Sequence, residues 1–577
     1  MEILKLLSKI ILILYTLNFI CGTSYSNEPI DIWKIEKINK LKNDNSEDIK
    51  IENEKLLQTL KIDQGNNNVI VNQDLDTSEI KLVGLYDPSD NGLTIDMWSN
   101  SDGKEIKEIF DNIKIKNLSN ISDKILDIVL LTNSYQPINN ISAEEFLEFK
   151  FEYLIRKRDF DLIKKFLIKN PKINNTKLVK FYVDFHLTNS QIKESCEIFD
   201  VINLVTDEYL TNFKIYCLIN QDKKEQAQLL FDLKSELEEV DEFFVKKFNV
   251  LMGYENIDNT LSDKNILYLH LSHKTSDNFN YEPNINTPIY VLKYLSNANL
   301  LKKTDIIDLE NIDQIKLVEK ATNDEIYYEA ELLDLYKRFN FNINQLLNVK
   351  EAYKILPEYE GRALLYQRLL LTVDSEKKLE LSSKLKKSFE DSNLSNAFNK
   401  ELAKILNTID EKNVPSNFTT FYKKNKEPNK AKENKIKINN KIIHQSKLIN
   451  YFLNKTSLPK AEKEINDLLK KIKKNKKYSF TKKDIIMIES LKSDGVKILK
   501  KYENLYDYKS NLPSEINSKI VNGETALVLL RLIEIIGENE VENLDIDSIS
   551  FVVGILNELK VIDLRNEVLL KVLPLKV

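Results

Sequence analysis

Apolar residues recur in this chain mainly three or four positions apart, which is the spacing of an amphipathic helix. Ser142 and Glu145 form an S-x-x-E capping box before FLEFKFEYLIRKR, and Asp159 is placed to cap FDLIKKFLIKN, which Pro171 ends. Two helices joined by so short a turn pack antiparallel, as a helical hairpin. The pattern therefore predicts an all-α fold.

The hairpin pattern recurs along residues 106–415. Three further pairs of segments carry it: QIKESCEIFDVINL with DEYLTNFKIYCLIN, KEQAQLLFDLKSEL with EFFVKKFNVLMG, and EAELLDLYKRF with INQLLNVKEAYKIL. Helical hairpins in series bury their apolar faces on their neighbours and form a solenoid. We expect residues 106–415 to form an elongated, TPR-like solenoid of stacked antiparallel helical hairpins.

Residues 76–105 have a different pattern. The stretch EIKLVGLYDPSDNGLTIDMWSNSDG holds three of the eleven glycines, a proline and one of the two tryptophans, which is typical of turns and short β-type runs. The first hairpin of a solenoid has an unpaired apolar face. We expect residues 76–105 to form a small β/loop module in which Val83, Leu85, Ile95 and Trp98 cover that face.

Polar segments separate these regions from the ends of the chain. Residues 27–75 are rich in Asn, Lys and Glu and predict a poorly ordered tether, and the Lys/Asn-rich residues 416–445 predict a linker. The pattern becomes helical again in a C-terminal unit, residues 446–577, which includes GETALVLLRLIEIIGE and SISFVVGILNELK. Gly537 is well placed to follow the end of a helix there.

The first 26 residues predict a secretory signal peptide. Lys5 and Lys9 precede a short apolar run, and Ser24 and Ser26 have the small-residue spacing that signal peptidase needs, so cleavage is expected between Ser26 and Asn27. Cys21 is a poor lipid acceptor, since Asn, Phe and Ile precede it. We therefore expect an exported protein of the periplasm rather than a lipoprotein.

The composition argues against several classes of protein. Only 11 Gly and 12 Pro occur in 577 residues, which disfavours sandwiches and barrels. The formal net charge of −5 becomes −6 once the signal peptide is removed, and it argues against a general nucleic-acid binder. Because no second apolar run reaches eighteen residues, no transmembrane span is expected in the mature chain.

Two cysteines, Cys196 and Cys217, remain after cleavage. They fall in consecutive predicted helices, within one helical turn of facing each other across the hairpin. An oxidising compartment favours a disulfide between them, whereas two buried free thiols packed as small hydrophobes are the common alternative. Both interpretations remain open at this point.

No catalytic, metal-binding or cofactor-binding residue emerges. His270 and His273 have the spacing of two zinc ligands but lack an identifiable third ligand, and Glu489 lacks the glycine-rich sequence that follows the acid of lytic transglycosylases. The lysine cluster at residues 470–477 fits contact with an anionic membrane or an acidic partner, or else an ordinary solvated helix end. This cluster is the densest basic patch of the sequence, and the sequence does not decide between the two interpretations.

Several segments together resemble a family of signal-bearing helical proteins of alphaproteobacteria, sometimes labelled antifreeze-glycopeptide-polyprotein-like. The resemblance is carried by GLTIDMW, KFEYLIRKRDFDLIKKFLIKNP, Cys196 with Cys217, EAELLDLYKRFNF and GRALLYQRLL. It implies an exported helical protein and no particular activity, and the lysine-rich tract near residues 423–441 departs from it most.

The expected function is that of a non-enzymatic scaffold for protein–protein interaction in the periplasm, because a solenoid offers a large surface without a catalytic pocket. The alternative is a cell-wall-associated protein that binds glycan or weakly hydrolyses it. Glycan grooves need aromatic platforms, and Trp33 and Trp98 are the two tryptophans. Composition alone would also allow a secreted protein of an AT-rich parasite.

Overall fold

The computed structural model describes residues 82–576, apart from 115, 172, 174, 203–206, 238–239, 427–435, 476 and 508–511. This part of the chain is mostly helical, with helices α3 to α29 and very little strand, so the predicted all-α class is confirmed. The predicted signal peptide, with its cleavage site at Ser26 and Asn27, and the predicted tether lie outside the described residues. The described residues form two compact units.

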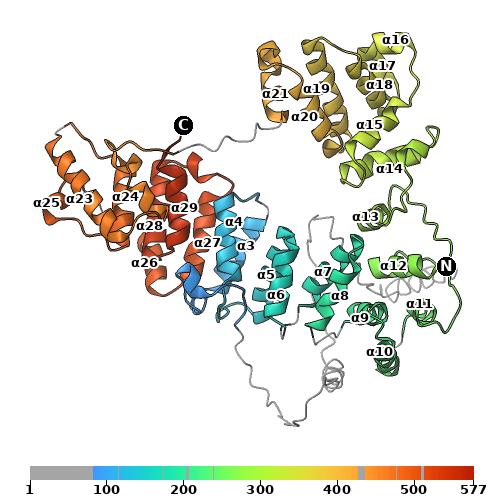
Figure 1. Ribbon diagram of the computed structural model, residues 1–577, viewed down its shortest axis with the longest axis horizontal. Coiled ribbons are helices and arrows are strands. Elements are labelled where there is room, and N and C mark those ends of the chain that lie inside the picture. Colours follow the sequence, from blue (N-terminus) through green and yellow to red (C-terminus); the bar gives the residue numbers. More distant parts are fainter. Residues whose placement is uncertain are drawn as a thin grey trace, which may run out of the picture. The chain divides into compact units, whose positions relative to one another are not determined.

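Unit 1 comprises the described residues of 183–197 and 207–426. Most of its helices pack against a neighbour in sequence, such as α9 with α10, α11 with α12, α17 with α18 and α18 with α19 (Figure 1). They are the end of α7 (Thr176–Thr188), α8 (Ile192–Glu197), α9 (Glu208–Asn220), α10 (Lys224–Leu237), α11 (Glu242–Met252), α12 (Ile266–Thr275), α13 (Ile289–Asn297), α14 (Ile312–Asn323), α15 (Glu329–Lys337), α16 (Ile343–Leu347), α17 (Val349–Ile355), α18 (Glu358–Leu370), α19 (Ser375–Asp391), α20 (Asn399–Asn407) and α21 (Thr419–Asn425).

Helix α18 lies at the centre of a large apolar core in unit 1. Leu364, Leu365 and Leu369 of this helix are buried together with side chains of α15, α19 and α20. Gly361 permits its close approach to α17, because a Cβ atom at Gly361 would lie 2.7 Å from the Tyr353 carbonyl oxygen. The packing of α18 against α17 thus requires glycine at the start of the GRALLYQRLL segment.

Two segments of unit 1 differ from the sequence-based expectation. The segment INQLLNVKEAYKIL forms two short helices, α16 and α17, rather than one, because Asn348 between them leaves helical geometry. The segment expected as a linker at residues 416–445 includes a helix, α21, because Tyr422 is buried there and its hydroxyl donates to the Ile409 carbonyl oxygen at 2.8 Å. Apolar anchoring overrides a polar composition in this case.

Unit 2 comprises the described residues of 82–182, 198–202 and 436–576. Two-residue strands β1 (Ile436–Lys437) and β2 (Leu575–Lys576) pair antiparallel, with Ile436 opposite Lys576. The helices are α3 (Gly103–Lys114), α4 (Asn120–Leu131), α5 (Ala143–Lys157), α6 (Phe160–Lys169), the start of α7, α22 (Ile449–Phe452), α23 (Leu458–Lys474), α24 (Lys482–Ser493), α25 (Lys500–Glu503), α26 (Ser514–Val521), α27 (Thr525–Ile536), α28 (Ile546–Glu558) and α29 (Ile562–Val572).

The two helices expected on either side of Asp159, α5 and α6, both form. Ser142 caps α5 through a complete capping box with Glu145, and the Asp159 side chain accepts a hydrogen bond from the Leu162 amide at the start of α6. Both side chains satisfy amides that a helix leaves unpaired in its first turn. The short turn between the two helices is therefore determined by local sequence.

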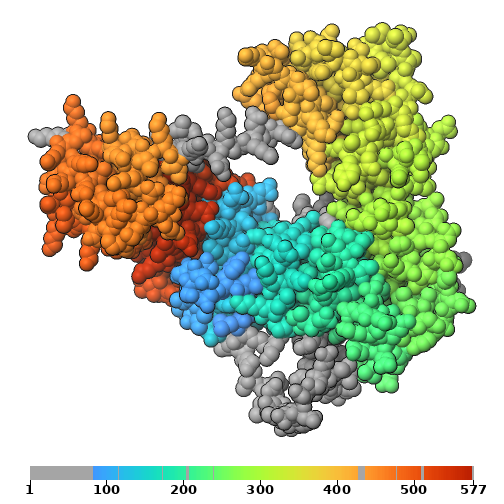
Figure 2. All heavy atoms as spheres, viewed as in Figure 1, coloured from blue at the N-terminus to red at the C-terminus, as the bar shows by residue number. Residues whose placement is uncertain are grey.

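Residues from the two ends of the described chain share one core in unit 2. Helix α27 packs against α3 and α4, and the blue and red parts of the chain lie side by side in Figures 1 and 2. Glu105 of α3 forms ion pairs with Lys519 at 2.7 Å and with Arg531 at 2.8 Å. The Ser122 hydroxyl donates to the Gly537 carbonyl oxygen at 3.0 Å, directly after α27. The C-terminal helices thus complete the packing of the first ones.

The β/loop segment before α3 packs into the same unit. Isolated bridges join Val83 to Ser134 and Tyr86 to Thr132, and Trp98 is fully buried with its ring 5.1 Å from that of Phe146. Ile95, which was expected to help cover the apolar face of the first hairpin, is 38% exposed. Turn geometry over this stretch directs Met97 and Trp98 inward instead, and both are 0% exposed.

Candidate functional site

A cleft of about 940 Å³ lies in unit 1 between the end of α14, the start of α18 and the residues after α19. Its wall combines exposed apolar side chains with charged and amide groups. The lining residues are Ile285, Ile289, Ile312, Lys316, Glu319, Lys320, Asn323, Asp324, Pro357, Glu358, Tyr359, Arg362, Ser392, Asn393 and Leu394. A cleft of this size and mixed lining is typical of a site for a ligand with both apolar and polar groups.

The floor of the cleft is held by a buried ion pair. Arg362 of α18 donates to Glu319 of α14 through Nε at 3.0 Å and Nη2 at 2.7 Å, and the two residues are 2% and 3% exposed. The Tyr336 hydroxyl donates to the same carboxylate. Burial, together with the negative charge of Glu319, raises the pKa of Tyr336, so the phenol remains a donor. The bidentate geometry fixes α18 against α14.

The rim of the cleft carries groups that remain accessible. Ile312 is 46% exposed and Ile285 is 38% exposed. The Lys320 ammonium donates to the Ile285 carbonyl oxygen at 2.5 Å, whereas Lys316 makes no ion pair with any described residue. The rim therefore offers apolar contact beside a free cationic group.

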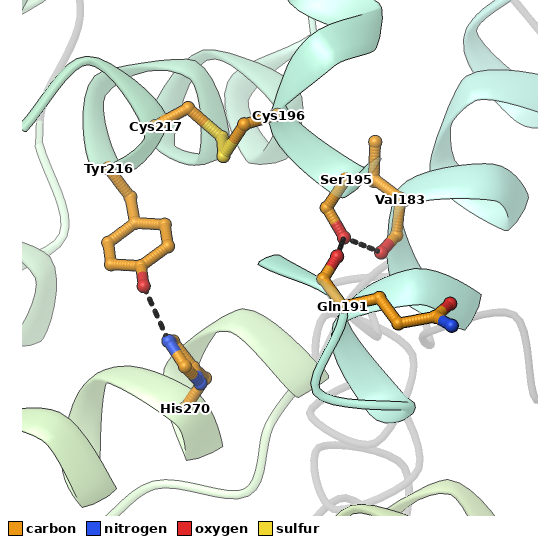
Figure 3. The surroundings of a disulfide bond; sticks show 7 residues. All are labelled: Val183, Gln191, Ser195, Cys196, Tyr216, Cys217 and His270. Carbon is orange, nitrogen blue, oxygen red and sulfur yellow. Dashed lines mark hydrogen bonds between the residues drawn. A yellow bond between two sulfur atoms is a disulfide. The ribbon is translucent and has the colours of Figure 1, made fainter. Parts of the chain in front are cut away.

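The two cysteines whose pairing the sequence leaves open are brought together in unit 1. Cys196 of α8 and Cys217 of α9 are joined by a disulfide, with their Cα atoms 5.3 Å apart (Figure 3). Nearby, the Ser195 hydroxyl donates to the Val183 carbonyl oxygen at 3.1 Å and ties α8 to α7. The bond closes the chain between two helices whose connection includes a 3-10 turn, residues 198–200.

The two histidines weighed as zinc ligands lie in a tyrosine network instead. His270 Nε2 lies 2.6 Å from the Tyr216 hydroxyl (Figure 3), and the Tyr294 hydroxyl lies 2.9 Å from His270 Nδ1 and 2.8 Å from His273 Nδ1. Burial, with the charges of Lys274 and His273, lowers the pKa of His270 to about 3. Neutral His270 can donate to one tyrosine and accept from the other.

This network predicts a loss of stability in acid. Unfolded His270 takes up a proton below about pH 6.5 while the folded form stays neutral to about pH 3, so the unfolding free energy falls as the pH falls between these values. At pH 5 the loss is about 2 kcal/mol. Urea titrations at pH 7 and pH 5 measure it, with His270→Gln as the control, since glutamine donates and accepts without charging. Equal pH dependence in the two proteins would exclude His270 as the source.

His444 has a structural role that the sequence did not indicate. His444 Nδ1 donates to Asp484 at 2.7 Å, and the Tyr478 hydroxyl and the Thr481 amide donate to the other carboxylate oxygen. Although burial opposes the charge, the hydrogen bonds from His444 and Thr481 help lower the pKa of Asp484 to about 2. The T-x-x-D spacing of Thr481 and Asp484 is a capping-box signal that could have identified the start of α24.

The remaining sequence candidates do not gather into a reactive site. Glu489 pairs with Lys492 at 2.8 Å and accepts a hydrogen bond from Tyr506. Among the described residues, no group of three or more His, Cys, Asp or Glu side chains is placed to hold a metal ion. No helix in the described part of the chain is both long and apolar enough to cross a membrane.

Comparison with known proteins gives no relative. The chain matches no family profile, no curated protein and no solved structure. The interpretation of the cleft therefore depends on its own geometry.

Proposed function

We propose that this protein is an exported, non-enzymatic scaffold that binds a segment of a partner protein in the cleft of unit 1. The cleft of about 940 Å³, with exposed Ile285 and Ile312 beside polar and charged groups, is the observation that carries the proposal. Apolar side chains of a peptide would pack on the two isoleucines, while its backbone and charged groups would meet the amides and Lys316.

The buried pair beneath the cleft supports a binding role. Because Arg362 and Glu319 satisfy one another, neither has to be desolvated again when a ligand arrives. A wall held in place before binding lowers the entropic cost of association. The groups left for recognition are those on the rim.

The architecture we propose is a TPR-like solenoid of stacked antiparallel helical hairpins. Support comes from the packing of sequence neighbours along unit 1, such as α9 with α10 and α17 with α18. Helices that contact mainly their neighbours leave extended surfaces for partners. The family of exported alphaproteobacterial proteins that the sequence resembles is part of the same proposal.

The compartment we propose is the periplasm. The predicted signal peptide supports export, and the disulfide between Cys196 and Cys217 is a bond that persists in oxidising compartments. The partner is accordingly expected to be another envelope protein.

The proposal predicts that a negative charge at the rim weakens peptide binding. Peptides selected on the purified protein from a random library should bind Ile312→Asp at least about tenfold more weakly, because the substitution places a desolvated carboxylate against apolar ligand groups. Isothermal titration with the selected peptides measures the change. Ile355→Asp is the matched control, since Ile355 is 85% exposed on α17 and does not line the cleft. Peptides that bind both variants equally would place recognition elsewhere.

The glycan alternative has weaker support. Trp98 is 0% exposed and packs on Phe146, so it cannot serve as a sugar platform, and Trp33 lies outside the described residues. Recovery of only peptidoglycan fragments after crosslinking in the native envelope would favour this alternative over a protein partner.

A further inference from the structure

The end of α23 presents a row of lysines to solvent in unit 2. Ala461, Ile465, Leu469 and Ile472 form the buried face of this helix. The other positions of the helix face solvent. Lys470, Lys471, Lys473 and Lys474 occupy such positions and are all exposed. Four lysines of the cluster noted in the sequence thus lie at the end of α23, the exposed Lys477 follows the helix, and Lys476 lies outside the described residues.

Tertiary packing adds a second group of lysines to the first. Helix α25 packs on α23, and the Lys473 ammonium donates to the Lys501 carbonyl oxygen at 3.0 Å. The ammonium groups of Lys473 and Lys501 lie 5.8 and 5.1 Å from the centre of the Tyr502 ring. We call the combined surface the α23–α25 lysine face, which consists of Lys470, Lys471, Lys473, Lys474, Lys497, Lys500 and Lys501.

The charge of this face is not neutralised within the described part of the chain. None of its seven lysines forms an ion pair with a described residue, whereas many other lysines in this part of the chain do. Asp467 and Glu503 are the exposed carboxylates of the two helices, and the half-buried Glu462 accepts from the Lys497 amide at 3.1 Å, so the seven lysines outnumber the carboxylates of the face. Maintaining so many like charges together costs free energy, which an anionic partner would recover.

An exposed apolar side chain lies within the same face. Leu499 precedes α25 and is 50% exposed, between Lys497 and Lys500 in sequence, and Ile498 beside it is partly exposed. Binding to a soluble polyanion would gain little free energy from an exposed leucine. At a lipid surface, an apolar residue enters the headgroup region while neighbouring lysines contact anionic headgroups and keep their ammonium groups in water.

We propose that the α23–α25 lysine face docks on the surface of an anionic lipid membrane. The lysines supply attraction to the headgroups, and Leu499 supplies a shallow apolar anchor. This contact is peripheral and reversible, and it is separate from the cleft of unit 1 in both residues and chemistry. A failure of either proposal therefore leaves the other standing.

Vesicle sedimentation tests the proposal. The chain from Asn27 onward is used, so that the apolar start of the sequence does not contribute to lipid binding. It should sediment with vesicles of phosphatidylcholine mixed with phosphatidylglycerol and not with phosphatidylcholine alone. Raising the salt from about 0.1 M to about 1 M shortens the Debye length from about 10 Å to about 3 Å and should release the protein.

Two variants separate the lysine and leucine contributions. K470Q/K474Q/K500Q should lower the partition coefficient roughly 100-fold, because each lysine near an anionic surface contributes about fivefold. Leu499→Gln should lower it about tenfold by removing the apolar anchor. The matched control is K377Q/K387Q/K412Q, which removes three exposed lysines of unit 1 and should bind as the parent does.

Several outcomes would overturn the proposal. These are no binding to the anionic vesicles, equal losses in the two triple variants, or unchanged vesicle binding in Leu499→Gln together with tight retention on heparin. The last result would identify a soluble polyanion as the ligand. Circular dichroism of each variant verifies that its helices remain folded.

Discussion

Replacing Arg362 with methionine should destabilise unit 1 by about 3 to 5 kcal/mol. The substitution leaves the Glu319 carboxylate buried without the two hydrogen bonds that now neutralise it at 3.0 and 2.7 Å. It also removes the donor to the Ser392 hydroxyl at 2.8 Å, at the far wall of the cleft. Hydrogen exchange followed by mass spectrometry measures the effect, with α14, α18 and α19 expected to lose protection by at least about 100-fold.

A double substitution separates charge from packing. In E319Q/R362M the buried charge is gone, yet the glutamine oxygen still accepts from the Tyr336 hydroxyl. Replacing both partners of a buried ion pair is often nearly neutral, so this variant should recover most of the lost protection. If Arg362→Met alone changes the stability by less than about 1 kcal/mol, the pair does not hold the cleft together.

Reducing the disulfide should cost about 3 kcal/mol of stability in the same unit. Cys196 and Cys217 are 21 positions apart, and a cross-link over a loop of that size removes conformational entropy mainly from the unfolded chain. Denaturant titrations with and without dithiothreitol should therefore show a lower midpoint for the reduced protein. Titrating free thiols in the unfolded protein before and after reduction gives the number of bonded cysteines as the difference.

The double variant C196A/C217A provides the control for packing. Both side chains are 2% exposed, so alanine also removes some buried volume. This variant should be at least as unstable as reduced wild type, and dithiothreitol should not change its midpoint. A wild-type midpoint that is insensitive to reductant would show that the bond does not contribute to stability.

Much of the local structure could be predicted from neighbouring residues. The caps at Ser142 and Asp159 depend on side chains within three positions of the amides they bind, so sequence was sufficient to identify them. The sequence also identified Cys196 and Cys217 as a possible pair, because they lie in consecutive helices only 21 positions apart. Such features need no knowledge of the rest of the fold.

The candidate site could not be predicted in the same way. Glu319, Tyr336 and Arg362 span 43 positions and belong to three helices, and an acid, a phenol and a guanidinium so far apart form no pattern in a chain this rich in charge. The α23–α25 lysine face could be predicted from the sequence only in part. Its α23 part is a visible run of lysines, whereas Lys497 and Lys500 join it only because α25 packs there.

The sequence by itself determined the helical class, the main helix caps and the position of the two cysteines, because these depend on spacing along one helix or across one turn. Tertiary structure alone decided that α3 and α4 share a core with α27, through Glu105 with Arg531 and Ser122 with Gly537. Those partners are over 400 positions apart. Contacts at such separations depend on the free energy of the whole packing arrangement, which no local pattern of apolar residues encodes.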